Sequence, residues 1–192
     1  MQLVDWQIRQ LCLDVKPPMI TPFSETRQEG GVVSYGLTSA GYDVRLHPEV
    51  WVFKNTYGQT IDPKQFKDED YIKKAFDTIT RNIVHLPPHS YMLGRSFEYI
   101  HIPRHLKARC IGKSTYARCG LLINCTPMEP DWEGFLTIEI ANLTPCHINV
   151  YTMEGIAQFE FEKLDAMVEC SYKDKVGKYD KQTSVTPAKV KV

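Results

Sequence analysis

The sequence lacks the features that mark membrane, secreted or strongly charged proteins. No apolar run approaches about 18 residues, the length that a membrane-spanning helix needs. The first ten residues, MQLVDWQIRQ, show no basic flank followed by an apolar stretch, so we expect no signal peptide. The formal net charge is +0, which creates no overall field for nucleic acid or for an anionic membrane. We therefore expect a cytoplasmic protein with no nucleic-acid partner and no membrane partner.

The sequence also lacks the cysteine pairs that mark disulfide frameworks and many zinc sites. Its six cysteines include no C-x-x-C pair and stand at positions 12, 110, 119, 125, 146 and 170. Without an export signal, we interpret them as reduced thiols that are mostly buried. One large class of zinc hydrolases carries H-x-E and P-C-x-x-C motifs. Only half-matches occur here, His47-Pro48-Glu49 and Pro145-Cys146, so we expect no zinc and no protein metal site.

Length and patterning favour one mainly β domain over residues 1–192. A globular chain of 192 residues buries enough surface to fold without disulfides. A short helix is expected over 5–15, where apolar residues recur at i, i+3, i+4 and i+7 after a candidate N-cap, Asp5. Residues 55–80 are ambiguous, although Tyr71, Ala75 and Phe76 indicate one or two helical turns. Alternating segments between proline and glycine turns predict strands over 42–46, 50–53, 90–95, 97–102, 107–111, 121–124, 135–142, 147–151, 156–162 and 167–170, a rhythm typical of a β-barrel or sandwich.

The last segment, 171–192, differs in composition from the rest of the chain. It holds six lysines against two aspartates, a net charge of +4, and few apolar residues. One interpretation is a solvated, disordered end. The other is a mobile flap that orders over a bound anion and excludes water from a site. Composition leaves both interpretations open.

One glutamate stands between apolar neighbours. The segment Leu136–Asn142 alternates, so as a strand it directs Ile138 and Ile140 to one face and Thr137 and Glu139 to the other. Glu139 can then face either solvent or a pocket. In a pocket, desolvation would raise its pKa and let it act as a base and then as an acid near neutral pH.

A basic segment precedes this strand. Lys113-Ser114-Thr115, followed by Arg118, offers positive charge, hydroxyls and N–H groups that suit phosphate oxygens. A P-loop is excluded, because Lys107 stands where its first glycine belongs. The alternative is an ordinary helix cap at Ser114 with a surface arginine. The residues alone thus indicate a mainly β domain with a candidate anion site, and they name no reaction.

Several ordered motifs resemble those of the dCTP deaminases, members of the trimeric dUTPase-like superfamily. They cover nearly the whole chain except 55–80, and they are SYGLTSAGYDVRL (34–46), GKSTYARCG (112–120), TPMEPDWEG (126–134), EGIAQ (154–158), and Ser171-Tyr172 with Gly177-Lys178-Tyr179. The resemblance implies a distorted dUTPase-like β-barrel with a flexible C-terminal tail, and a homotrimer with active sites between subunits. It implies hydrolytic deamination of dCTP to dUTP and ammonia, which supplies dUTP for dUMP and dTTP synthesis. It further implies Mg2+ bound through the substrate triphosphate, no zinc, and dTTP as a candidate feedback inhibitor.

The resemblance also implies roles for individual residues. Glu139 would be the general base that activates the water attacking C4 of cytosine, Ser114 would orient that water, and Arg118 would keep Glu139 ionised. The other expected substrate contacts are Thr137 and Ile138 through their backbones, Glu129 near the deoxyribose, Lys113, Ser114 and Thr115 at the phosphates with Tyr116 and Ala117 in the same segment, and Gln158, Tyr172, Lys178 and Gln182 at the sugar or triphosphate.

Two positions depart from patterns of the superfamily. Lys113 stands where some members have arginine, so a point charge replaces a bidentate phosphate contact. Where dUTPases typically carry aspartate followed by tyrosine, this chain has Glu129 and Trp132. Trp132 either excludes a ribose 2′-hydroxyl by its bulk or packs in the core. Glu129 leaves open a bifunctional deaminase–diphosphatase that yields dUMP, and a non-catalytic nucleotide-binding module is the remaining alternative.

Overall fold

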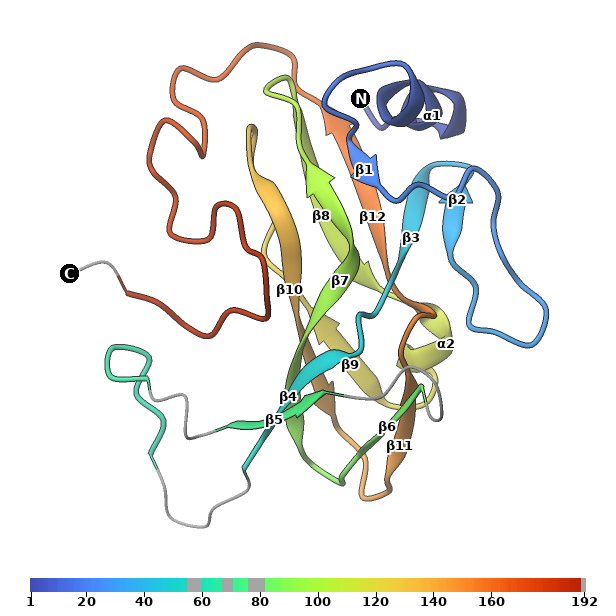
Figure 1. Cartoon of the computed structure of the whole chain (residues 1–192), viewed down its shortest axis with the longest axis vertical. Coiled ribbons are helices and arrows are strands. Elements are labelled where there is room, and N and C mark those ends of the chain that lie inside the picture. The colour runs from blue at the N-terminus through green and yellow to red at the C-terminus, as the bar shows by residue number, and fades with distance from the viewer. Residues whose placement is uncertain (55–59, 67–70, 76–81, 191–192) are drawn as a thin grey trace.

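Strands dominate the part of the chain that the computed structural model describes, residues 1–54, 60–66, 71–75 and 82–190 (Figure 1). The elements are α1 Asp5–Leu13, β1 Ile20–Thr21, β2 Gly36–Thr38, β3 Gly41–Arg45, β4 Glu49–Phe53, β5 Tyr71–Ala75, β6 Ile83–Leu86, β7 Tyr91–His101, β8 Leu106–Gly112, α2 Ser114–Ala117, β9 Leu121–Asn124, β10 Glu133–Asn142, β11 Ile148–Tyr151 and β12 Gly155–Lys163. The mainly β fold with a short N-terminal helix is thereby confirmed. Among the described residues, no helix is long and apolar enough to cross a membrane.

The described strands form three antiparallel sheets that enclose the core without closing on one another. The largest has the order β5-β4-β7-β10-β9, with β1 beside β7. The second has the order β2-β3-β12-β8, and β11 pairs with β6. Fully buried side chains such as Tyr42, Phe159 and Ile140 fill the space between them. The predicted distorted barrel therefore describes the fold only loosely.

The N-terminal helix agrees with the prediction except at its ends. Val4 is the N-cap instead of Asp5, and the Gln7 side chain accepts a hydrogen bond from the Val4 backbone at 3.1 Å. The helix ends at Leu13 and not at residue 15, and it buries Ile8 and Cys12. Burial of this apolar face fixes the helix on the barrel.

Two predicted elements are wrong. Residues 71–75, expected as helical turns, form β5, while Phe76 lies outside the described residues. Antiparallel pairing with β4 overrides the local helical pattern there. Residues 167–170, expected as a strand, are irregular, because the carbonyl oxygens of Val168 and Glu169 accept hydrogen bonds from Arg104 at 3.4 and 3.3 Å.

The strands predicted over 90–95 and 97–102 are one continuous strand, β7. The apolar pattern is interrupted by three polar side chains that are nevertheless buried, Arg95, Ser96 and Glu98. Each is bonded within the protein; Glu98, for example, accepts a hydrogen bond from the Arg45 side chain at 2.7 Å. Because buried polar groups are tolerated when they are paired, β7 continues through them. Its full length then lies beside β10.

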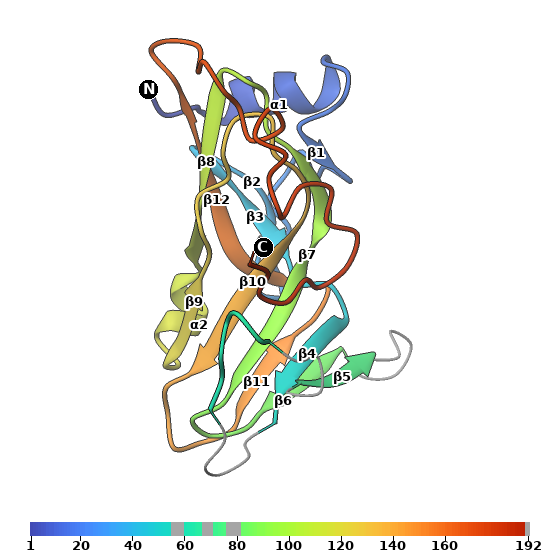
Figure 2. The same cartoon turned by 90° about the vertical axis from the view of Figure 1, so that its left-hand side faces the viewer.

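The tail lies against the outside of the large sheet. Figure 2 shows it crossing in front of β10 and β7. The backbone N–H of Phe135 donates to the carbonyl of Gln182 at 2.9 Å, and that of Lys181 donates to Glu133 at 2.8 Å. Gly134 permits this approach, since a Cβ there would lie 2.7 Å from the Gln182 nitrogen. Hydrogen bonds attach the tail to the strands as far as Thr186, and the flexibility of the tail stays a prediction.

The cysteines are all free thiols, but the expectation that most are buried is wrong. Only Cys12 is buried, and Cys119, Cys146 and Cys170 are exposed. Each exposed cysteine comes directly after a polar or turn residue in the sequence. The apolar character of cysteine alone therefore does not determine whether the thiol is buried.

Candidate active site

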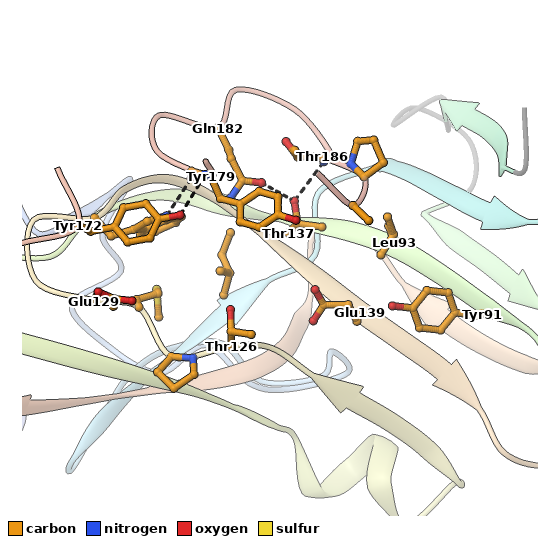
Figure 3. A pocket seen from close by; sticks show the side chains of 16 residues that line it. Tyr91, Leu93, Thr126, Glu129, Thr137, Glu139, Tyr172, Tyr179, Gln182 and Thr186 are labelled. Carbon is orange, nitrogen blue, oxygen red and sulfur yellow. Dashed lines mark hydrogen bonds between the residues drawn. The ribbon is translucent and has the colours of Figure 1, made fainter. Parts of the chain in front are cut away.

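A pocket lies between the large sheet and the tail (Figure 3). Its walls come from β7, from the turn over 126–132, from β10 and from the tail. It encloses about 260 Å³, close to the lower end of the ~300–1,000 Å³ common for small-molecule sites. The tail forms its roof, so the pocket depends on how this segment is held.

Glu139 projects from β10 into this pocket. Ile138 and Ile140 are fully buried in the core, so the predicted alternation and the pocket-facing interpretation of Glu139 are confirmed. Burial raises the pKa of Glu139 to about 7. Its Oε2 atom is buried and has no hydrogen-bond partner among the described residues. Such a carboxyl populates both protonation states near neutral pH and can therefore accept and return a proton.

The pocket has two chemically different ends. Figure 3 shows Glu139 and Tyr91 at one end, and Glu129 and Tyr172 at the other. The Tyr172 hydroxyl accepts a hydrogen bond from the Tyr179 backbone at 3.0 Å, and burial raises the pKa of Tyr172. Glu129 lies 3.3 Å from the Lys175 amine on the exposed side. A ligand that spans the pocket would thus meet an acid–base group at one end and polar tail residues at the other.

Two residues of the barrel hold the roof directly. The Thr137 hydroxyl donates to Gln182 Oε1 at 2.8 Å and accepts a hydrogen bond from the Thr186 backbone at 3.1 Å. The Trp132 indole donates to the Tyr179 carbonyl at 2.9 Å. Trp132 is also part of the core cluster and lines the pocket, so its core-packing role is confirmed. These bonds fix the height of the tail above Glu139.

The basic segment lies elsewhere in the chain. Figure 1 places α2 on the far side of the barrel from the tail. Its exposed residues are Ser114, Thr115, Ala117 and Arg118, and none of them lines the pocket. The N-cap of α2 is Lys113, so the expected cap at Ser114 is off by one position. The surface that carries the expected water-orienting and charge-supporting residues is thus separate from Glu139 within one chain.

Four other expected contact residues are engaged in the chain's own structure. Lys113 forms a buried ion pair with Asp43 and donates to Ser34 Oγ at 3.1 Å. The Tyr116 hydroxyl is buried and accepts a hydrogen bond from the Tyr151 backbone at 2.9 Å, and burial raises the pKa of Tyr116 to about 12. The Gln158 side chain donates to Thr38 Oγ1 at 3.2 Å. The Lys178 amine donates to the Lys189 carbonyl at 2.7 Å.

One chain therefore assembles part of the predicted site. Of the predicted residues, the pocket brings together Glu129, Thr137, Glu139, Tyr172 and Gln182. It does not include Lys113, Ser114, Thr115, Tyr116, Ala117, Arg118, Ile138, Gln158 or Lys178. The roles implied for this second set stay predictions.

The sequence prediction missed several residues that line the pocket. Tyr91 and Leu93 of β7, Thr126, and 186–188 of the tail were not expected there. Leu93 pairs with Glu139 in the β7–β10 register, so both side chains lie on one face of the sheet. Alternation along β7 would have indicated that face, but it does not reveal which strand β7 pairs with.

The half-match to a zinc motif has a structural task. His47 Nδ1 accepts a hydrogen bond from the Glu49 backbone at 2.9 Å, and Nε2 lies 2.8 Å from a guanidinium nitrogen of Arg95. Burial and the Arg95 charge lower the pKa of His47 to about 4. In the described part of the chain, no group of three or more His, Cys, Asp or Glu residues is placed to hold a metal ion.

The fold and the pocket define a class of protein: a small, mainly β protein with an acid–base group under a roof formed by its own tail. The chain belongs to the dCTP deaminase-like family, whose model matches residues 2–164. It is 48% identical over 174 residues to the dCTP deaminase of Chlamydia caviae, and the alignment covers 88% of this chain and 89% of that protein. It is 46% identical over 186 residues to the dCTP deaminase of a Nitratiruptor species, with 97% of each covered. The family resemblance seen in the motifs is thereby confirmed.

The fold is also similar to a solved structure. The crystal structure of 2′-deoxycytidine 5′-triphosphate deaminase from Agrobacterium tumefaciens matches with a TM-score of 0.60 at 17% identity. The match covers 87% of this chain and 49% of that one, so the chain spans about half of the solved protein. At this identity the likeness supports the fold.

Proposed function

We propose that this chain catalyses the hydrolytic deamination of dCTP, dCTP + H2O → dUTP + NH3. The observation that carries the proposal is Glu139, a half-buried carboxyl with a pKa raised to about 7 in the pocket of a dCTP deaminase-like protein. Relatives named dCTP deaminase are 46–48% identical over most of the chain, which supports the same substrate and reaction.

Glu139 acts as the proton carrier in this mechanism. Its ionised carboxylate takes a proton from water as the water oxygen attacks C4 of the cytosine ring, and it gives that proton to N3. It then takes the second proton from the new C4 hydroxyl and delivers it to the amino group. The C4–N bond breaks, ammonia leaves, and the carbonyl of uracil remains. A pKa near 7 suits a group that must both accept and donate at neutral pH.

A neighbouring chain supplies the rest of the active site in this proposal. Ser114 on its α2 orients the attacking water, and Arg118 stabilises ionised Glu139. The position of α2, exposed and away from its own pocket, supports this arrangement. Ile111 and Leu122, on the strands next to α2, are 45% and 52% exposed, as expected for a face that another subunit covers. We propose a homotrimer on this basis.

Mg2+ is proposed to bind through the triphosphate, without zinc. Mg2+ keeps several waters and favours phosphate oxygens over an all-protein cage. The polar end of the pocket offers one carboxylate, Glu129, which fits such a cation better than a dedicated metal site. The structural contacts of His47 support the absence of a zinc role for the half-matched motif. A cytoplasmic location, dUTP supply for dUMP and dTTP synthesis, and inhibition by dTTP complete the proposal.

Product analysis tests the function. Purified protein is incubated with dCTP and Mg2+, and ammonia, dUTP, dUMP and diphosphate are measured together. We expect ammonia and dUTP in equal amounts. Glu139→Gln should lower kcat at least about 100-fold while dCTP still binds, because only the proton carrier is lost. Glu160→Gln, a carboxylate of β12 outside the pocket, is the matched control and should leave kcat unchanged.

The other outcomes separate the alternatives. Diphosphate and dUMP together with ammonia would identify a bifunctional enzyme and assign Glu129 as a second catalytic group. Binding of dCTP without any product would contradict the proposed reaction and leave a nucleotide-binding module. A zinc chelator is expected to leave activity intact, whereas removal of Mg2+ should abolish it.

A further inference from the structure

One apolar side chain of the tail is buried although its sequence neighbours are polar. Val185, within KQTSVTPAK, is 2% exposed. It is the one buried apolar side chain of the tail over the described residues 171–190. Val176 and Val190, in the same tail, are 76% and 48% exposed. Valine is therefore not buried throughout the tail, and the burial of Val185 results from the residues that surround it.

Val185 occupies a small apolar socket that is separate from the main core. The socket is formed by Trp51 and Leu93, which are 8% and 5% exposed, and Phe66 packs against them. Trp51 and Leu93 are paired across β4 and β7. Leu93 is in turn paired with Glu139 across β7 and β10. The socket therefore begins one strand away from the catalytic carboxyl.

Phe66 comes from the excursion between β4 and β5, of which residues 54 and 60–66 are described. None of the family motifs in the sequence falls in this excursion. Its packing against the socket connects it to the tail and hence to the roof of the pocket. The excursion therefore contacts, through Phe66, the residues that surround Val185 of the tail.

The rest of the tail is held by polar contacts. Arg104 pairs with Asp174 at 2.8 Å and with Asp131 at 3.1 Å, which fixes the start of the tail. Gln182 is bonded to Thr137. Val185 lies between Gln182 and the roof residues 186–188, so it is the apolar contact at the far end of the roof.

We propose that the socket of Trp51, Leu93 and Phe66 anchors Val185 and so positions the roof of the pocket for substrate binding. Val185 and Phe66 are positioning residues, since they act through Gln182 and residues 186–188. This inference rests on the proposed function and adds to it a role for the excursion. Weakening the anchor frees the roof to leave the pocket, which lowers the affinity for substrate while Glu139 keeps its place on β10.

Val185→Ala and Phe66→Ala test the anchor by steady-state kinetics with dCTP. Each should raise KM by about five- to tenfold, the size expected when a few methyl-sized groups leave an apolar site, and change kcat less than about twofold. Val185→Thr keeps the shape but adds a hydroxyl, and it should raise KM in the same direction. Val190→Ala removes the same two methyl groups from an exposed position of the tail and should change neither constant.

Limited trypsin digestion provides a readout that needs no activity. Lys181 and Lys189 flank Val185, and the Lys181 side chain is 62% exposed. Cleavage at these sites should be several-fold faster in Val185→Ala and Phe66→Ala than in wild type or Val190→Ala. Unchanged KM and unchanged cleavage in both variants would overturn the anchor, as would a loss of kcat with KM unchanged. A wild-type protein that releases no ammonia refutes the proposed function instead, and the digestion still decides whether the anchor exists.

Discussion

At the scale of single residues, the pocket is distinguished by a buried carboxyl group that has no ion-pair partner, whereas other buried carboxyl groups of the protein have one. Glu98 is fully buried beside Arg45, and Asp43 is buried beside Lys113. Glu139 differs, because it is desolvated without a cation or hydrogen-bond donor at Oε2 among the described residues. Paired charges maintain the barrel, whereas the unpaired one is free to exchange a proton.

The raised pKa of Glu139 predicts a pH-dependent stability difference. Between about 4.3, the pKa in an unfolded chain, and about 7 the folded protein retains a proton that the unfolded chain has lost. The penalty for burying ionised Glu139 therefore grows as the pH rises through this range and is complete above it. Glu139→Gln removes the penalty, so its free energy of unfolding relative to wild type should be higher near pH 8 than near pH 5. Urea unfolding of both proteins measures this, and an equal difference at the two pH values would contradict it.

Lys113 is predicted to stabilise the fold through Asp43. Lys113→Met leaves the Asp43 carboxylate buried without its partner, so the free energy of unfolding should fall by about 3 kcal/mol. The double variant Lys113→Met/Asp43→Asn should regain most of that loss in the same urea experiment. Ser114→Ala, next in sequence but exposed, is the control. A single variant as stable as wild type would show that the ion pair contributes nothing.

At the scale of elements, the site depends on β7, β10 and the tail. Alternation around Glu139 predicted β10 and the direction of its side chains, because a strand with one buried face has a period of two. The same reasoning divided β7 in two, since its buried Arg95, Ser96 and Glu98 find their partners only after folding. It also missed β5, where pairing with β4 decides the structure. Local patterns therefore predicted β10, where apolar residues alternate, and failed for β5 and for the middle of β7, where pairing with another strand or between buried polar groups decides the structure.

Removal of the tail tests its role as the roof. Deleting 173–192 removes Tyr179, Gln182 and Val185, so KM for dCTP should rise or kcat should fall while the oligomeric state is unchanged. Steady-state kinetics and light scattering measure the two properties. Deleting only 191–192 is the matched control. Full activity of the longer deletion would rule out the tail as part of the active site.

At the scale of the whole molecule, one chain presents the two groups of proposed site residues on separate surfaces. The pocket with Glu139 lies under the tail, and α2 with Ser114 and Arg118 is exposed on the other side of the barrel. The motifs indicated all of these residues, but a sequence does not state which surfaces meet. Tyr91 and Leu93 went unnoticed for a related reason, because strand pairing over 40 or more positions is set by tertiary structure. The proposed trimer unites the two groups.

Mixed assemblies test this central claim most directly. Chains carrying Glu139→Gln and chains carrying Arg118→Ala are co-expressed with different tags, the mixed assemblies are purified through both tags, and ammonia release from dCTP is measured. Each variant alone is expected to be nearly inactive. In a cyclic trimer that contains both variants, about one interface in three joins an intact α2 to an intact pocket, so roughly a third of wild-type activity should return. Mixed assemblies that form and bind dCTP but release no ammonia would contradict an active site shared between chains.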